Sequence, residues 1–180
     1  MAAVASSAIL PSVERSALFT FVGRGFLSTD PAELLECWRQ LDPSGEYPTI
    51  SRALAGLRPE DLEREHVRLF LAPEGAPCPP WQSVHGDEAQ LMGASHHSAI
   101  EWFRSYGVEP ARETEPADHA GLLLSFFGHL LAEEAENALE FLASHLTWIR
   151  GFCDQVERHT SLDFYRLLAA QTGALLDSAE

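Results

Sequence analysis

The chain has 180 residues, of which 46% are hydrophobic, and it carries a net charge of −15. This length and apolar content fit one folded domain and exclude a disordered chain. Nucleic acid is disfavoured as a partner, because phosphate binding needs a basic surface; the acidity favours cationic partners instead. The longest apolar run, residues 120–131, is interrupted by Ser125, Gly128 and His129 and is too short to cross a bilayer, so we expect no membrane insertion.

The three cysteines, Cys37, Cys78 and Cys153, are widely spaced along the chain. Such spacing supplies neither a disulfide framework nor a metal knuckle and is typical of a reducing compartment. The first ten residues lack the basic segment that opens a secretory signal. We therefore expect a cytoplasmic protein.

Apolar residues recur with a helical period from residue 12 onward. Pro31 begins a second predicted helix, which ends near Pro43 and Gly45, and a short third helix covers residues 50–57. Pro59 suits the first turn of a fourth helix, where acidic residues complement the helix dipole. The stripe that predicts the first helix consists of Val13, Ala17, Leu18, Phe21, Val22 and Phe26.

Two more helices are predicted before a linker. Asp87 and Gln90 have the spacing of a capping box, which predicts a short helix beginning there. Another helix covers residues 95–107 and ends at a glycine. Residues 108–117 are charged and contain two prolines, so they form a predicted linker or hinge.

The second half of the chain is also helical in pattern, and hairpin signals and alternating β-branched runs are missing throughout. We therefore predict an all-α fold, a single-domain bundle of about eight to ten helices. Its expected parts are an N-terminal half (12–107), a hinge (108–117) and a C-terminal half (118–177). The last four helices are expected at residues 120–132, 135–143, 145–157 and 162–176.

Residues 69–87, LFLAPEGAPCPPWQSVHGD, form a proline-rich segment between two predicted helices. Prolines restrict φ and lower the conformational entropy of the loop, so it can hold Trp81 in place without support from a helix. A rigid Pro-Pro-Trp turn predicts a recognition surface. The alternative is that Trp81 only fills the core beneath the turn.

A second motif, Glu115-Pro116-Ala117-Asp118-His119, opens the most apolar helix. Proline in the first turn and acidic residues beside it suit a helix N-terminus. Glu115 and His119 are one helical turn apart and can face each other. The alternative is a well-capped helix whose histidine lies at the rim of the core.

Together the two motifs resemble the TorD/DmsD family of cytoplasmic chaperones, which mature and proofread redox enzymes exported by the twin-arginine route. The likeness runs from about residue 60 to the end of the chain. His66 and His85 stand where the family usually carries other aromatic residues, a departure that bears on which client is bound. The matching residues are His66-Val67-Arg68-Leu69-Phe70, Pro79-Pro80-Trp81-Gln82-Ser83-Val84, Asp87, and Glu115, Pro116, Asp118 and His119.

The resemblance implies a chaperone that binds the twin-arginine leader and the apo form of a molybdenum-cofactor oxidoreductase, assists cofactor insertion and proofreads before export. It implies no catalytic residues, metal or cofactor of its own. Carboxylates suit the two arginines, because guanidinium groups form bidentate pairs with them, and apolar walls suit the segment that follows. The expected peptide-binding residues are Leu69, Phe70, Trp81, Ser83, Val84, Asp87, Glu115, Asp118 and His119.

Two other functions remain open from the residues alone. A helical scaffold or oligomerisation module would use the same helices, and the predicted hinge would allow a homodimer by helix exchange. A metal-dependent enzyme is the second, although a di-metal bundle site needs Glu-x-x-His pairs on two helices, which the chain lacks. HExxH, GxSxG and nucleotide-binding glycine motifs are also missing.

Overall fold

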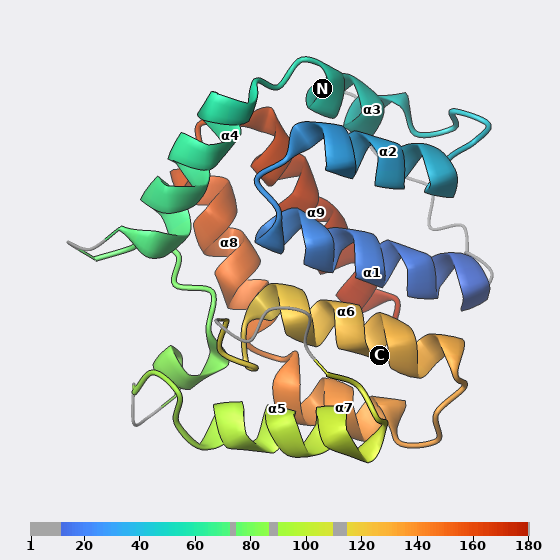
Figure 1. Ribbon diagram of the computed structural model, residues 1–180, viewed down its shortest axis with the longest axis vertical. Helices are drawn as coiled ribbons and strands as arrows, with labels where there is room; N and C mark the ends of the chain where they lie inside the picture. The colour runs from blue at the N-terminus through green and yellow to red at the C-terminus, as the bar shows by residue number, and fades with distance from the viewer. Residues whose placement is uncertain (1–11, 73–74, 87–89, 110–114, 180) are drawn as a thin grey trace.

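The computed structural model describes residues 12–72, 75–86, 90–109 and 115–179. Within these residues the chain forms nine α-helices, so the predicted all-α fold is confirmed (Figure 1). A π-helical turn, Val67–Leu71, extends α4, and a 3-10 turn, Gln82–Val84, follows the proline-rich segment. The helices are α1 (Ser12–Leu27), α2 (Pro31–Leu41), α3 (Pro48–Ala55), α4 (Pro59–His66), α5 (Ala94–Ser105), α6 (Ala120–Ala132), α7 (Ala138–His145), α8 (Ile149–His159) and α9 (Asp163–Asp177).

Most predicted boundaries fall within a few residues of the observed ones, and those of α6 coincide. The short helix predicted from the capping box is the exception. Asp87 lies outside the described residues, and residues 90–93 form a turn in which Met92 has a φ of 60°. The predicted hinge lies partly outside the described residues, so the division into two halves stays a prediction.

Helices α1 and α6 lie side by side through the middle of the molecule and contact each other more extensively than any other described pair (Figure 1). Glycines make this closeness possible. A Cβ added at Gly23 would lie 2.5 Å from the Gly121 carbonyl oxygen, and one added at Gly121 would lie 2.5 Å from that of Gly23. The Ser16 hydroxyl also donates to the Gly128 carbonyl at 2.7 Å across the contact. The backbones therefore meet directly, with no side chain between them.

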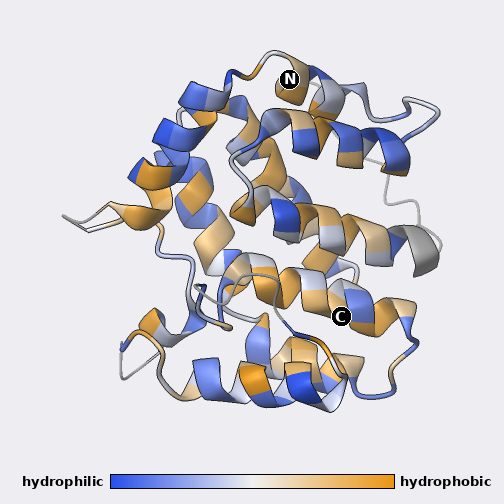
Figure 2. Ribbon diagram, viewed as in Figure 1, coloured by the Kyte–Doolittle hydropathy of each residue, from blue (hydrophilic) through white to orange (hydrophobic). Residues whose placement is uncertain are grey.

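The other helices cover this central pair. Helices α8 and α9 pack against each other beside α1, and α5 and α7 lie beyond α6 (Figure 1). The α6 ribbon is hydrophobic along most of its length, which suits a helix covered on several sides (Figure 2). Two side chains of α6, Phe126 and Phe127, contact Phe141 of α7, with ring centroids 5.0 and 6.5 Å from that of Phe141. The core thus lies around α6, whose N-terminus carries the second motif.

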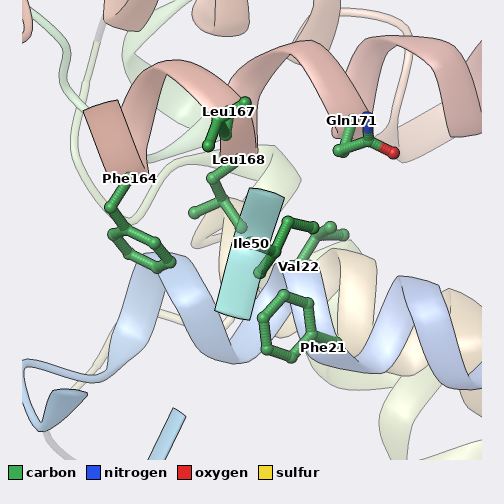
Figure 3. A pocket seen from close by; sticks show the side chains of 7 residues that line it. All are labelled: Phe21, Val22, Ile50, Phe164, Leu167, Leu168 and Gln171. Carbon is green, nitrogen blue, oxygen red and sulfur yellow. The ribbon is translucent and has the colours of Figure 1, made fainter. Parts of the chain in front are cut away.

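A cavity of about 10 Å³ lies between α1, α3 and α9 (Figure 3). Phe21, Ile50 and Leu168 are among its apolar lining residues, and Gln171 is the polar one. A space this small holds at most one water molecule. It is therefore a gap in the packing rather than a ligand site.

Buried Glu65 ties α4 to the end of α8. Its carboxylate accepts two hydrogen bonds from the Arg68 guanidinium at 2.8 Å, one from the Thr160 hydroxyl at 3.0 Å and one from the Ser161 N–H at 2.6 Å. Burial alone would raise the pKa of Glu65, but these donors outweigh it and lower the pKa to about 2. The helix that leads into the proline-rich segment is thereby fixed to the C-terminal helices.

This pKa predicts a loss of stability in acid. In the folded state the pKa of Glu65 lies below its ordinary value of 4.5. The ionised carboxylate therefore stabilises the fold above pH 4.5, and this stabilisation is lost as the pH falls towards 2. We expect the free energy of unfolding, measured by urea denaturation, to decrease less over this range in Glu65→Gln than in the unchanged protein. Exposed Glu60→Gln on the same helix is the control and should behave as the unchanged protein. Parallel curves for Glu65→Gln and the unchanged protein would contradict this account.

Candidate functional site

The two motifs, far apart in the sequence, meet at the N-terminus of α6. Trp81 and His119 form an isolated antiparallel bridge, the only strand-like pairing among the described residues. Beside it the Ala120 N–H donates to the Pro80 carbonyl at 2.7 Å. The turn that carries the tryptophan is therefore attached by its backbone to the start of the apolar helix.

Asp118 fixes this attachment from inside. Its side chain is fully buried, and its Oδ2 accepts the Ser83 N–H at 2.7 Å, while its backbone carbonyl accepts the Gln82 N–H at 3.0 Å. His96 Nδ1 lies 3.8 Å from Asp118 Oδ1, but it accepts the Ala117 N–H at 2.9 Å and so carries no proton there. Asp118 thus holds the 3-10 turn and is out of reach of a peptide in this conformation.

Trp81 and Glu115 form the accessible part of the junction, and the buried His119 lies next to them. The half-buried indole donates its Nε1–H to Glu115 Oε1 at 2.9 Å, and the Glu115 side chain is 23% exposed. His119 Nδ1 accepts the Gly121 N–H at 3.0 Å and caps α6, which leaves the proton on Nε2, 3.8 Å from Glu115 Oε1. The indole is therefore held in one orientation at the surface rather than sealed in the core.

Gln82 connects the turn to α7. Its amide oxygen contacts His145 Nδ1 at 2.8 Å, and its amide nitrogen donates to the Ser144 carbonyl at 2.9 Å. Burial lowers the pKa of His145 to about 4, although the negative charge of Asp118 opposes this shift. The ring is therefore neutral at neutral pH, with its Nε2 3.1 Å from the Ser98 hydroxyl of α5.

His85 and Trp148 extend the aromatic surface beside the turn. Their rings are in contact in a tilted arrangement, with centroids 4.6 Å apart and an interplanar angle of 30°. The His85 Nε2 donates to the Pro79 carbonyl at 2.7 Å, and the Trp148 indole N–H donates to the His145 carbonyl at 2.8 Å. His85 thus keeps an aromatic ring at a position where the motif resemblance leads us to expect one.

The predicted site residues separate into three groups. Leu69 and Phe70 lie in the core, where Phe70 packs against Tyr165 and other rings, so they do not form the walls of a surface groove as we predicted. Their helical spacing already indicated burial. Asp87 lies outside the described residues. The residues that the structure brings together are Trp81, Ser83, Val84, Glu115, Asp118 and His119.

Sequence reasoning did not assign Gln82, His96 or His145 to the site. Each acts through a partner more than twenty residues away, so neither spacing nor residue type could reveal its role. The position of Gln82 between Trp81 and Ser83 was the only local signal. These three residues hold the site rather than face a ligand.

Exposed apolar side chains lie near both ends of the proline-rich segment. The Gln90 N–H donates to the Ser83 carbonyl at 3.2 Å, and this hydrogen bond keeps the segment with Leu91 and Met92 next to the 3-10 turn. Large exposed apolar residues are common at surfaces that bind other proteins. The residues are Val67, Leu71, Leu91 and Met92.

The described residues include neither a metal cluster nor a membrane-spanning helix. They contain no group of three or more His, Cys, Asp or Glu side chains placed to hold a metal ion. No helix among them is long and apolar enough to cross a membrane.

Comparison with known proteins identifies the family. Residues 39–156 match the family described as the nitrate reductase delta subunit. The chain is also 32% identical over 152 residues to the Tat proofreading chaperone DmsD of Salmonella typhimurium, a match that covers 78% of this chain and 74% of the relative. The chain belongs to the TorD/DmsD family. The motif resemblance is thereby confirmed.

Two further comparisons show how far the likeness extends. A Haemophilus influenzae protein named as a probable Tat proofreading chaperone DmsD is 30% identical over 116 residues, which span 63% of this chain and 57% of that protein. A crystal structure of an Archaeoglobus fulgidus protein assigned to redox enzyme maturation superposes with a TM-score of 0.71 at 24% identity, covering 98% of this chain and 99% of that one. The chain described here shares that fold, and as a member of the TorD/DmsD family it is a chaperone rather than an enzyme.

Proposed function

We propose that this chaperone acts in the cytoplasm and binds the twin-arginine leader and the apo form of a molybdenum-cofactor oxidoreductase. It holds the client until the cofactor has been inserted and so proofreads it before export. The observation that carries the proposal is the Trp81 indole, fixed at the surface by its hydrogen bond to Glu115 where the two motifs meet.

The junction offers what such a leader requires. An apolar segment can pack against the indole and the exposed side chains Leu91 and Met92, and burial of apolar surface contributes about 25 cal/mol per Å². A basic side chain can pair with Glu115, one of whose carboxylate oxygens accepts the indole N–H. Asp118 supports this site by holding the turn, rather than by touching the peptide as the sequence alone led us to expect.

Calorimetry with leader peptides of molybdenum enzymes from the same genome tests the proposal. We expect Trp81→Ala to weaken leader binding roughly tenfold or more, since a central aromatic anchor commonly contributes about 2 kcal/mol. Circular dichroism should show unchanged helix content, because the indole is only half buried. A leader with Lys-Lys in place of Arg-Arg should also bind more weakly.

Tyr47→Ala provides the control, because Tyr47 is an exposed aromatic residue next to α3, away from both motifs. It should bind the leader as the unchanged protein does. A scaffold that only joins subunits makes a different prediction: leader affinity would be absent, or equal in the Trp81 and Tyr47 variants. Either result would overturn the proposed function.

A further inference from the structure

A second cavity, which is polar and has a volume of about 320 Å³, lies between α5 and α7. These two helices lie beyond α6 (Figure 1). This volume is within the range of small-ligand pockets. Residues of α5 line one side at one-turn spacings, and residues of α7 and the position before it line the other. The lining residues are Ser98, Glu101, Trp102, Ser105, Asn137 and Glu140. We call this cavity the α5/α7 groove.

The walls of the groove are fixed to each other. The Ser98 hydroxyl meets His145 Nε2 at one end, and the Tyr106 hydroxyl donates to the Asn137 amide oxygen at the other. Between them the half-buried Trp102 ring packs against Phe141 with centroids 5.3 Å apart and planes at 75°. The groove is therefore preformed, and a ligand would not have to bring the two helices together.

The charge of the groove is negative. Glu101 and Glu140 line it from opposite helices, and both are exposed. Neither forms an ion pair with a basic side chain of the described residues, and this includes Arg104 of α5. Like charges that line one cavity disfavour each other unless a cation lies between them. This lining therefore favours a cation that fits beside an indole.

We propose that the α5/α7 groove binds a guanidinium group, an arginine side chain of the client leader. This inference rests on the proposed function and assigns a place to part of the leader. A guanidinium group stacks on an aromatic ring and donates in a planar fork to carboxylates, whereas an ammonium group is a compact and strongly hydrated charge. Trp102, Glu101 and Glu140 supply that combination, and the serine hydroxyls add acceptors.

Hydrogen bonds connect the walls of the groove to the tryptophan junction. Ser98 contacts His145, whose other ring nitrogen contacts Gln82, the residue next to Trp81. Helix α5 also reaches the second motif, because His96 accepts the Ala117 N–H. The groove and the junction are therefore joined by side-chain contacts of the same elements.

A second receptor for arginine is needed for a twin-arginine leader. At the junction, Asp118 is fully buried, and one oxygen of Glu115 already accepts the Trp81 indole N–H. Among the described residues, the junction thus offers one accessible carboxylate to two neighbouring guanidinium groups. The α5/α7 groove supplies two more carboxylates beside it.

A short peptide tests the groove separately from the proposed function. The probe is N-acetyl-Arg-Arg-amide, which lacks the apolar segment of a leader, added to the full ¹⁵N-labelled chain. We expect it to shift the indole N–H resonance of Trp102, identified by its loss in Trp102→Phe. N-acetyl-Lys-Lys-amide should shift this resonance much less. An unchanged Trp102 resonance, or equal shifts with both peptides, would overturn the inference.

A charge-matched pair of double variants completes the test. Glu101→Gln/Glu140→Gln removes the two groove carboxylates, and Glu133→Gln/Glu136→Gln removes two exposed charges outside the groove lining. We expect the first pair to abolish the Trp102 shift and to weaken binding of the full Arg-Arg leader about tenfold, and the second pair to change either by less than about twofold. Equal effects of the two pairs would show that the overall charge of the protein attracts the peptide, and they would overturn the proposed guanidinium site.

The two proposals fail in different ways. If leader binding depends on Trp81 but is the same in both double variants, the guanidinium site in the groove is wrong and the proposed function still holds. A Trp102 shift by the short arginine peptide, together with no binding of any full leader, overturns the proposed function and supports guanidinium binding by the groove.

Discussion

Gly121→Ala is expected to lower the free energy of unfolding by about 3 kcal/mol, because α1 and α6 meet backbone to backbone at this position. The new methyl group would lie 2.5 Å from the Gly23 carbonyl oxygen and 2.6 Å from Leu27 Cγ. Backbone atoms cannot rotate away as a flexible side chain can. The two central helices would therefore have to move apart, and the packing of the whole core would change with them.

The control is Gly151→Ala on α8, where a Cβ meets nothing within 4 Å. Alanine is a better helix former than glycine, so this variant should gain up to about 1 kcal/mol. Urea denaturation of both variants measures the difference. If Gly121→Ala were as stable as Gly151→Ala, the close contact between α1 and α6 would be wrong.

Asp118→Ala is expected to weaken leader binding as strongly as Trp81→Ala does, about tenfold or more, although Asp118 does not reach the surface. Without the carboxylate, the buried Ser83 N–H loses its acceptor at 2.7 Å and the turn that carries the indole is released from α6. The unpaired N–H should also cost about 2 kcal/mol of stability. Asp118→Asn, which keeps one acceptor oxygen, should retain part of the binding.

A double variant separates positioning from direct contact. If Asp118 acts through the indole, Trp81→Ala/Asp118→Ala should bind the leader no more weakly than Trp81→Ala alone, because the two changes disrupt one interaction. Calorimetry with the same leader peptide measures this. Additive losses would mean that Asp118 contacts the peptide itself, as we inferred from the sequence.

The helices could be predicted because their signals are local. Helix α6 has proline and acidic residues before it and apolar residues throughout, and its predicted and observed bounds coincide. The capping box at Asp87 was equally local, yet residues 90–93 form a turn. Capping residues stabilise a helix only where apolar residues with helical spacing follow, and Gln90 is followed by an exposed leucine and methionine instead.

The site could be predicted only in part. Motif resemblance located Trp81 and Glu115, which the structure joins by a hydrogen bond. It could not show that Asp118 faces inward, because that depends on a backbone N–H 35 residues away. Nor could it reveal the α5/α7 groove, whose residues have ordinary helical spacing on two separate helices.

The neutral ring of His145 bears on how a client could be set free. With a pKa of about 4, the imidazole keeps the same protonation state from about pH 6 to pH 8, so its contacts with Gln82 and Ser98 persist over that range. Modest changes in acidity inside a cell therefore leave this linkage between the turn and the two helices intact. Under the proposed function, protonation of this histidine therefore does not release the client in that pH range.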